Sequence, residues 1–373
     1  MYEELIKYRD KLYTCNRSHC GFCQEGCLPY KLLGYEQYSS RGRMILSRVL
    51  IERNIKIDEN IVDIVFNCFL CGFCNAKCAL YPTDIFTALR REINKAGLTP
   101  RPLIEVANNI VSSGNPYAFS REDRYKWTKD IQITTKSQSI YFPGCVYPYL
   151  QAKQTKTIYS LLAKTGIEIS YIPEIDNCCG YPVYLTGDME KFEAIAKKNY
   201  ENWKRQGIKK IYTPCPGCYK TLAEIYPEFI ENYDIEVYHA VLAIHDAYEN
   251  GKIRLQKKYQ TITYHDPCDL TRFMRVIEEP RKLIEAISNE FIELDYHGYF
   301  AKCCGGGGLV VAYNPQLHLQ ASIHRAKEIE SVGAEIVTTF CPTCLRTLRK
   351  GLKRIKAKTK LIDLGQLIFS SMQ

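Results

Sequence analysis

The C-terminal two thirds of the chain alternate short apolar runs with longer stretches of helical periodicity. Runs such as Ser139–Phe142, Lys210–Thr213 and Thr261–Tyr264 have the length and the β-branched or aromatic content typical of strands. The stretches between them place apolar residues on one helical face, and several end at a glycine. This alternation favours parallel sheets with helices on their faces. The other predicted strands are Glu168–Ile172, Ile235–Tyr238, Phe291–Leu294, Glu335–Thr339 and Lys360–Ile362, and the predicted helices are Gln151–Lys164, Asp188–Gln206, Tyr219–Ile230, His239–Asn250, Arg281–Ser288, Gln316–Val332, Leu345–Leu352 and a last helix to Met372.

The first hundred residues show helical periodicity instead. Apolar residues share one face of each of three predicted helices, and we expect these faces to pack into a core. The third helix is predicted to end at Gly97. The stretch 101–135 contains prolines and a charged run, and it is predicted to be a linker or covering segment. The three apolar faces are Ile45, Leu46, Val49 and Leu50; Ile61, Val62, Ile64 and Val65; and Ile85, Ala88, Leu89 and Ile93.

Cysteine is the outlier in the composition, since the 373 residues include 18 cysteines and 7 histidines. A disulfide framework is disfavoured because the chain is much longer than the small secreted domains that need one. The cysteines also fall in tight groups with two-residue gaps, a spacing that brings thiolates together on a metal. The formal net charge of +9 is only weak support for a nucleic-acid partner, and no Lys/Arg block is long enough for a phosphate-binding arm, so no nucleic acid is expected.

The first ten residues and the apolar runs of the chain bear on the cellular compartment that we expect. The segment Met1–Asp10 contains acidic residues and no apolar signal core. No apolar run approaches the ~20 residues that a membrane span needs. We therefore expect a protein of the reducing cytoplasm that has no intrinsic membrane span and that meets a membrane, if at all, at its periphery through a partner.

Eight cysteines lie within the first hundred residues, in two groups. The second group has the spacing C-x2-C-x2-C-x3-C, and the first differs only in its first gap, which is two residues longer. In ferredoxins of this spacing, three thiolates of a group hold one [4Fe–4S] cluster and the fourth holds the other. Zinc sites normally use two C-x2-C pairs separated by a longer loop, so zinc is disfavoured here. The crossed pattern predicts two metal sites, one formed by Cys15, Cys20, Cys23 and Cys78 and one formed by Cys27, Cys68, Cys71 and Cys74.

The remaining ten cysteines form an internal repeat. Matching cysteines of the two copies are offset by 123, 125 and 126 residues. This predicts two homologous α/β domains of about 120 residues each. Each cysteine group follows a predicted strand, so the five thiols of a copy can converge at one edge of a sheet. The first copy comprises Cys145, Cys178, Cys179, Cys215 and Cys218, and the second comprises Cys268, Cys303, Cys304, Cys341 and Cys344.

Five thiolates exceed the number that an ordinary cubane cluster needs. Four thiolates satisfy a cubane, and a fifth implies an irregular cluster with a bridging thiolate or with an iron open to an incoming ligand. The hypothesis that one five-cysteine motif carries zinc as a structural element stays open. Together the two kinds of group use all 18 cysteines.

Three other residues near the second copy are candidates for the site. Gly305 and Gly306 belong to a run of four glycines that lacks the Lys-Ser/Thr ending of a phosphate loop, so we expect its backbone N–H groups to approach a cluster. His265, three residues before Cys268, is a candidate to donate a proton to a leaving thiolate or to tune a cluster, and a structural, hydrogen-bonded histidine is at least as good an interpretation. No G-x-G-x-x-G segment follows a predicted strand, so no flavin is expected in this chain.

The cysteine pattern resembles that of the CCG-domain (cysteine-rich) proteins, specifically the B-type and D-type catalytic chains of the heterodisulfide reductase family. Two ferredoxin motifs ahead of two CCG domains are similar to the D-type chain. The resemblance implies an α/β protein with a helical bis-[4Fe–4S] ferredoxin-like domain at 1–100, a linker or covering segment at 101–135, and homologous Rossmann-like CCG domains at 136–255 and 256–373 that are related by a pseudo-twofold axis. It also implies two cubane clusters on the N-terminal cysteines and one noncubane [4Fe–4S] cluster on each five-cysteine motif.

The same resemblance implies an activity. Electrons arrive one at a time through the ferredoxin clusters, and a disulfide that enters between the two noncubane clusters is cleaved; thiol oxidation uses the same parts in reverse. The expected partners are a disulfide or thiol substrate and a redox partner subunit, either a flavoprotein or a membrane cytochrome or quinone-linked protein.

An alternative comes from a second resemblance. The segments Cys27–Gly34 and Ser39–Met44 are similar to the iron–sulfur subunits of glycolate, D-lactate and glycerol-3-phosphate dehydrogenases. In that alternative the chain passes electrons from a flavin-dependent 2-hydroxy acid or glycerol-3-phosphate dehydrogenase to a quinone or another carrier. Many such subunits lack some of the ten cysteines that this sequence has, so the complete set favours disulfide chemistry.

Overall fold

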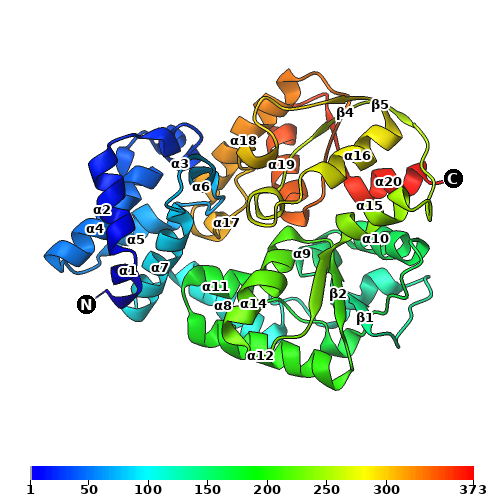
Figure 1. Ribbon diagram of the computed structural model, residues 1–373, viewed down its shortest axis with the longest axis horizontal. Coiled ribbons are helices and arrows are strands. Elements are labelled where there is room, and N and C mark those ends of the chain that lie inside the picture. Colours follow the sequence, from blue (N-terminus) through cyan, green and yellow to red (C-terminus); the bar gives the residue numbers. More distant parts are fainter. Residues whose placement is uncertain (1) are drawn as a thin grey trace.

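The computed structural model describes residues 2–373. Figure 1 shows a group of helices at the N-terminus, then a first sheet with its helices, and then a second sheet with its helices. The N-terminal helices lie at one end of the molecule, against both sheet-containing parts, and the C-terminus lies at the opposite end.

The N-terminal part is helical, as the periodicity predicted. The apolar face of α7 is buried at Ile85, Ala88, Leu89 and Ile93. Side chains cap the starts of two helices: Ser39 accepts from the Gly42 amide before α4, and Asp58 accepts from the Ile61 amide before α5. The helices are α1 (Glu3–Ile6), α2 (Arg9–Ser18), α3 (Leu28–Leu33), α4 (Ser40–Arg53), α5 (Glu59–Phe66), α6 (Phe73–Lys77) and α7 (Pro82–Lys95).

The prediction for the buried face of α4 was only partly right, since of its four residues only Leu50 is fully buried. Ile45, Leu46 and Val49 are only half-buried, whereas Arg43 and Met44 are fully buried. Arg43 faces inward because its guanidinium donates to the backbone carbonyl oxygens of neighbouring segments. A buried arginine on a helix face breaks the apolar periodicity from which such a face is predicted.

The first sheet has three parallel strands in the order β1-β2-β3, namely β1 (Ser139–Tyr141), β2 (Lys210–Thr213) and β3 (Glu236–His239). Ile140 pairs with Ile211, and Ile211 pairs with Val237. The helices of this part are α9 (Val146–Leu150), α10 (Ala152–Lys164), α11 (Tyr181–Thr186), α12 (Met189–Arg205), α13 (Pro216–Lys220), α14 (Tyr226–Phe229) and α15 (Ala240–Glu249).

One prediction within this part needs correction, and another needs refinement. The segment predicted as a strand at Glu168–Ile172 makes a single parallel bridge, between Ser170 and Ile140. The next amide, that of Tyr171, bonds to the carbonyl of Thr134 outside the sheet, and Pro173 then offers no N–H. The helix predicted at Tyr219–Ile230 is present, but it begins earlier, at Pro216, and contains a π-helical turn at Thr221–Ile225 between α13 and α14.

The second sheet has four parallel strands in the order β5-β4-β6-β7. β5 begins three residues before the predicted strand. The prediction missed Ser288, Asn289 and Glu290 because these residues are polar and lie on an edge strand, so they carry no apolar signal. The strands are β4 (Tyr259–Tyr264), β5 (Ser288–Ile292), β6 (Ile336–Thr339) and β7 (Lys360–Asp363), and the helices are α16 (Glu278–Ile287), α17 (Val310–Tyr313), α18 (Pro315–Ser331), α19 (Pro342–Arg354) and α20 (Leu364–Ser371).

Residues 101–135 contain helix α8 (Arg101–Ser113) and a 3₁₀ segment at Glu122–Thr128. The buried side chains of Ala107 and Ile110 in α8 join the core cluster that contains Cys178. This segment therefore packs on the first sheet-containing part.

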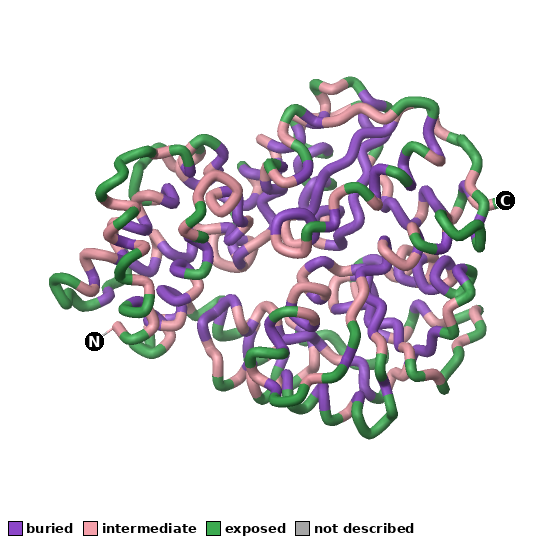
Figure 2. Tube along the Cα trace, in the orientation of Figure 1, coloured by how far each residue is buried: buried purple, intermediate pink, exposed green. Residues whose placement is uncertain are grey.

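The two sheet-containing parts share one hydrophobic core. Helix α10 packs against α20, and α15 packs against α16, so each part contributes two helices to their contact (Figure 1). Figure 2 shows that buried backbone runs through both sheets, while exposed backbone follows the outer loops. The parallel α/β architecture predicted from the sequence is confirmed. Among residues 2–373, no helix has both the length and the apolar composition needed to cross a bilayer.

Candidate functional site

The C-terminal cysteines gather where parallel strands end. Cys145 and Cys215 follow β1 and β2, while Cys268 and Cys341 follow β4 and β6. Because the carboxyl ends of parallel strands meet at one edge of a sheet, the groups of each repeat converge. The thiols of both repeats then face one cavity of about 400 Å³. Its wall includes nine of the ten cysteines: Cys145, Cys178, Cys179, Cys215, Cys218, Cys268, Cys304, Cys341 and Cys344.

The five thiols of the first repeat form a continuous row. Cys178 lies in hydrogen-bonding contact with Cys145 and Cys179, and Cys218 joins Cys179 to Cys215. We call these five cysteines the first set. Hydrogen bonds from Cys178 and Cys218 lower the pKa of Cys179. The thiolate form is therefore favoured at Cys179.

The second repeat has the same order of contacts. Cys303 contacts Cys268 and Cys304, and Cys344 joins Cys304 to Cys341. The Sγ atoms of Cys304 and Cys344 are 3.5 Å apart. We call these five cysteines the second set. Hydrogen bonds from Cys303 and Cys344 lower the pKa of Cys304, which is the counterpart of Cys179.

Backbone amides point at several of these sulfur atoms. The amides of Gly305 and Gly306 donate to Sγ of Cys303 and Cys304, both at 3.3 Å. In the first set, the Gly180 amide donates to Sγ of Cys178 at 3.4 Å. Such N–H···S bonds favour the thiolate form and tune a bound cluster.

His265 is buried beside the second set. Arg325 donates from Nε to Nδ1 of His265 at 3.3 Å, so the ring proton sits on Nε2, and the ring hydrogen-bonds to Cys304. Burial lowers the pKa of His265 and keeps the ring neutral. His265 is not on the cavity wall. In the first repeat the corresponding position is Phe142, so this hydrogen bond distinguishes the two sets.

Buried ion pairs, which the sequence analysis missed, hold the cysteine loops. Arg124 donates to both carboxylate oxygens of Asp176, at 2.7 and 2.9 Å, and to the Gly144 carbonyl at 2.8 Å. In the second repeat Arg281 makes a similar buried pair with Asp266, at 2.9 Å for both bonds, although the two pairs stand at different positions of the repeat. The sequence did offer one indication of these aspartates, since each stands two residues before a cysteine of the motif.

The eight N-terminal cysteines fall into two groups in space. Burial, with the charges of Cys23, Cys78 and Cys20, raises the pKa of Cys15 to about 11. We call Cys15, Cys20, Cys23 and Cys78 the outer set, because Cys20 is exposed.

The other four N-terminal cysteines, Cys27, Cys68, Cys71 and Cys74, form the inner set. Burial, with the charges of Cys68, Cys71 and Cys27, raises the pKa of Cys74 well above its usual range. Burial also raises the pKa of Cys27, to about 11. The mutual influence of these thiols shows that they lie close together.

The inner set touches the second set directly. Cys71 accepts a hydrogen bond from Cys303, and this bond lowers the pKa of Cys71. The glycine run allows the approach, because a Cβ on Gly307 or Gly308 would overlap the backbone carbonyl of Phe69 or Cys68. Cys303 is also the one cysteine of the two sets that is off the cavity wall.

The donor sets fit iron–sulfur clusters. All eighteen cysteines are free thiols in the part of the chain that the structure describes. Thiolates are the soft ligands that iron–sulfur clusters use. Nitrogen atoms that point at sulfur lie beside the first and second sets, and buried nitrogen atoms without a protein partner, Nη2 of Arg43 and Nη2 of Arg272, lie beside the inner set. Buried donors without partners are expected where a negatively charged group belongs.

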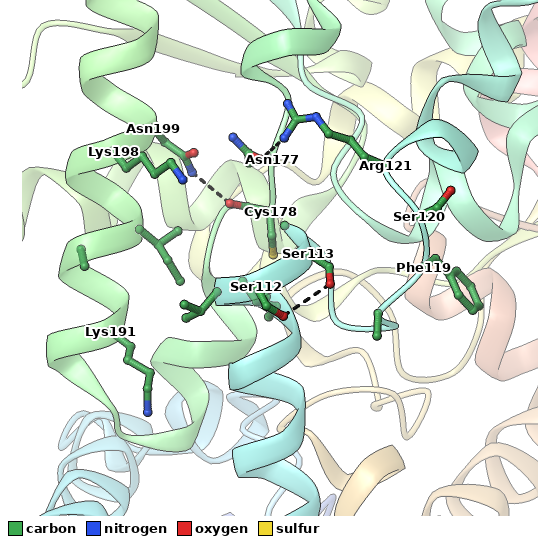
Figure 3. Close-up of a pocket in the computed structure, with 16 residues that line it drawn as sticks. Ser112, Ser113, Phe119, Ser120, Arg121, Asn177, Cys178, Lys191, Lys198 and Asn199 are labelled. Carbon is green, nitrogen blue, oxygen red and sulfur yellow. Dashed lines mark hydrogen bonds between the residues drawn. The ribbon is translucent and has the colours of Figure 1, made fainter.

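A second cavity, of about 530 Å³, reaches Cys178 from outside, between α8 and α12 (Figure 3). Asn199 of α12 donates to the carbonyl oxygen of Cys178 at 2.9 Å. Lys191, Lys198 and Arg121 also line this cavity. Cys178 therefore belongs to the walls of both cavities.

Comparison with known proteins finds cysteine-rich and iron–sulfur relatives. Residues 139–223 and 262–349 match the family model described as CCG, cysteine-rich domain. The D chain of the dihydromethanophenazine:CoB--CoM heterodisulfide reductase of Methanosarcina acetivorans is 29% identical, over 97% of this chain and 94% of the relative, and its counterpart in Methanosarcina mazei is equally similar. The EtfAB:quinone oxidoreductase of Syntrophomonas wolfei is 24% identical, over 87% of this chain and 48% of the relative. The resemblance to the CCG-domain and heterodisulfide reductase proteins is confirmed, and iron–sulfur clusters are supported as cofactors.

Proposed function

Because the chain carries two cysteine-rich CCG domains, we propose that it is the iron–sulfur subunit of an oxidoreductase complex that reduces a disulfide, or oxidises two thiols in the reverse direction. The observation that carries this proposal is the shared cavity of about 400 Å³, whose wall contains thiols of both five-cysteine sets. A disulfide presents two sulfur atoms, and a cavity with one thiol-rich wall for each of them suits its cleavage.

The donor sets support four iron–sulfur sites. The outer and inner sets would each hold a cubane [4Fe–4S] cluster with four thiolates, and the first and second sets would each hold a noncubane [4Fe–4S] cluster with five. When bound, these clusters supply one-electron transfer and, at the five-cysteine sites, iron that is open to sulfur. The alternative of zinc in the second set rests on His265, Cys304 and Cys344, whose ligand atoms lie within 4.8 Å of one another.

The other wall residues suit an organic disulfide. Leu185, Leu309 and Val311 line the cavity and would exclude water from around the carbon chains of the substrate. Arg346 and His318 also line it and would contact polar substituents. Reduction adds two electrons and two protons to the disulfide, breaks the S–S bond and releases two thiols.

The order of contacts supports one direction of entry for electrons. The outer set has the exposed Cys20, and the inner set contacts the second set through Cys71 and Cys303. Electrons from a partner subunit would therefore pass from the outer set to the inner set and reach the cavity through the second set. The hydrogen bond from His265 to Cys304 supports a tuning role for this histidine, since His265 is off the cavity wall.

The second candidate function is electron transfer to a quinone or another carrier from a flavin-dependent dehydrogenase. Its support is the similarity to the EtfAB:quinone oxidoreductase. In either function the chain works with a redox partner subunit, which would be a flavoprotein or a membrane cytochrome or quinone-linked protein. The complete pair of five-cysteine sets on one cavity favours the disulfide activity.

A stoichiometric assay separates the two candidates. The iron-loaded chain is reduced with dithionite under anaerobic conditions, freed of excess reductant and mixed with 2-hydroxyethyl disulfide. We expect the disulfide to release two thiols for every two electrons that the protein loses. This thiol yield should fall to near zero in Cys179→Ser and in Cys304→Ser. Reoxidation by a quinone analogue, with no thiol released from the disulfide, would instead support the electron-transfer function.

A further inference from the structure

Three arginines are buried around the inner set without a carboxylate partner. Arg43 of α4 and Arg90 of α7 have an exposed fraction of 0%, and Arg272, in the π-helical turn after Cys268, has 4%. None of the three forms a salt bridge with any residue between 2 and 373. Buried arginines elsewhere in this chain, such as Arg124 and Arg281, do have aspartate partners.

Arg90 joins the inner set to both sheet-containing parts. Its Nη2 donates to the Cys68 carbonyl at 2.9 Å, and its Nη1 donates to the carbonyls of Leu185 and Gly308, both at 2.9 Å. The guanidinium also lies 4.6 Å from the ring centroid of Phe66. Its Nε has no hydrogen-bond partner.

Arg272 lies between the inner set and the second set. Its Nε donates to the Cys71 carbonyl at 2.6 Å, and its Nη1 donates to the carbonyl of Ala301, two residues before Cys303. Its Nη2 has no partner. Burial lowers the pKa of Arg272, but the thiolates of Cys71, Cys268 and Cys303 outweigh this effect, and the pKa is raised overall.

Arg43 adjoins Cys27 of the inner set. Its Nη1 donates to the Tyr38 carbonyl at 2.6 Å, and the Cys27 thiol donates to the same oxygen at 3.7 Å. The charge of Arg43 lowers the pKa of Cys27. Nη2 of Arg43 has no partner. Each of the three arginines thus adjoins an inner-set cysteine and leaves one nitrogen atom unbonded.

Burying three cations that bond only to carbonyl oxygens is costly unless an anion lies nearby. Each of the three arginines has an inner-set cysteine nearby that can carry negative charge, and Arg272 also has Cys268 and Cys303 of the second set. A cluster on these four thiolates is negatively charged, and its reduction adds one more negative charge. Away from water, that extra charge is destabilising unless fixed positive charge compensates it.

We propose that Arg43, Arg90 and Arg272 form a cationic cage that stabilises the reduced state of a cluster held by the inner set, so that this buried centre accepts an electron without contact with water. The inference rests on the proposed function, in which the inner set holds a [4Fe–4S] cluster. The step is the gain of one electron from a one-electron donor, with no bond broken and no proton taken up. At the outer set, where Cys20 is exposed, water can compensate the added negative charge instead.

The experiment separates the effect of the positive charge from the effect of side-chain shape at Arg90 and Arg272. The full chain is loaded with iron anaerobically, and the midpoint potentials of its N-terminal clusters are measured by EPR during titration with dithionite. Cys23→Ser and Cys74→Ser assign the outer and inner signals. Arg90→Met, Arg90→Lys, Arg272→Met and Arg272→Lys each lose the planar fork, but only the Lys variants keep the charge.

We expect both Met variants to lower the inner midpoint potential, the Lys variants to stay near wild type, and the outer signal to stay unchanged. Arg275→Met is the matched control, because Arg275 is an exposed arginine three residues after Arg272, and it should leave both signals unchanged. Loss of the inner cluster in the Met variants alone would also support the cage.

Equal shifts or equal losses in the Met and Lys variants would overturn the cage and leave the arginines a purely structural role. No shift in any variant would overturn it as well. A wild-type chain without iron in its N-terminal half would instead refute the proposed function, so the two failures are distinguishable.

Discussion

At the residue scale, buried charge pairs hold the loops that present the cysteines. Arg124 comes from the segment before β1, yet it binds Asp176 beside the Cys178–Cys179 pair and the carbonyl of Gly144 beside Cys145. The geometry of the cysteine loops therefore depends on individual side chains that are far apart in the sequence.

Asp176→Asn tests this dependence. The change leaves the Arg124 guanidinium buried without its counter-charge, and we expect a loss of about 3–5 kcal/mol in the free energy of unfolding. The measurement is urea denaturation of the full chain. Glu193→Gln is the control: it breaks an ion pair with Lys197 whose side chains are about half exposed, and it should cost below about 1 kcal/mol. Equal losses in the two variants would contradict the account.

His265→Phe tests the asymmetry between the two sets. The change gives the second repeat the residue that the first has at Phe142, and it removes the hydrogen bond to Cys304. A hydrogen bond to a charged group is worth about 1.5–3 kcal/mol, so we expect the potential of the second-set cluster to fall by on the order of 100 mV. EPR titration should show the first-set signal unmoved; a shift of both signals, or of neither, would argue against this role.

Asp363 gives a prediction for pH. Its carboxylate is buried, accepts from the Tyr147 hydroxyl at 2.7 Å and caps α20. Burial raises its pKa from 3.8 to about 6. The protonated form is therefore favoured in the fold: its stabilising effect is complete below about pH 4 and is lost as the pH rises through about 6.

Asp363→Asn does not ionise, so it isolates this effect. The stability of the variant relative to wild type should increase between about pH 4 and about pH 7, by up to about 3 kcal/mol. Urea midpoints across this range provide the measurement. A difference between variant and wild type that does not change with pH would show that Asp363 is not the titrating group.

At the element scale, the positions of strands and helices were largely predictable because the periodicities of the strands and of their covering helices are strong. The failures have local causes. Ser288–Ile292 begins with polar residues on an edge strand, and the face of α4 contains the buried Arg43. The segment at Glu168–Ile172 makes only one bridge because its next amide bonds outside the sheet.

The glycine run before α17 sets the contact between the N-terminal helices and the second repeat. Gly308→Ala places a Cβ on the Cys68 carbonyl, which is backbone and cannot move away cheaply. We expect a loss of more than about 2 kcal/mol in stability and a weaker magnetic interaction between the inner-set and second-set clusters. Gly333→Ala is the matched control: it also has a positive φ, of +75°, but its Cβ would meet nothing within 4 Å, so the cost should be about 1 kcal/mol. Similar costs for the two variants would mean that the close approach is unimportant.

At the scale of the whole molecule, the cysteine groups form a series from the exposed Cys20 to the cavity between the two repeats. The grouping of the cysteines could be predicted from the crossed ferredoxin spacing and from the internal repeat, because it depends on sequence spacing even where Cys27 and Cys78 join cysteines far from them in the chain. The arginines around the inner set were not predictable. Arg272 meets Cys71 across 201 residues, and nothing in the local sequence distinguishes it from a surface arginine.

The central claim, that both five-cysteine sets hold iron and meet a sulfur substrate in one cavity, is tested most directly by EPR. The iron-loaded chain is poised under mildly oxidising, anaerobic conditions, and its spectrum is recorded before and after addition of 2-mercaptoethanol, together with iron and zinc content. We predict iron in both halves of the chain and a thiol-dependent signal that is retained in Cys20→Ser but lost in Cys179→Ser or Cys304→Ser. A spectrum that does not respond to the thiol, or zinc in place of iron at both five-cysteine sets, would contradict the account.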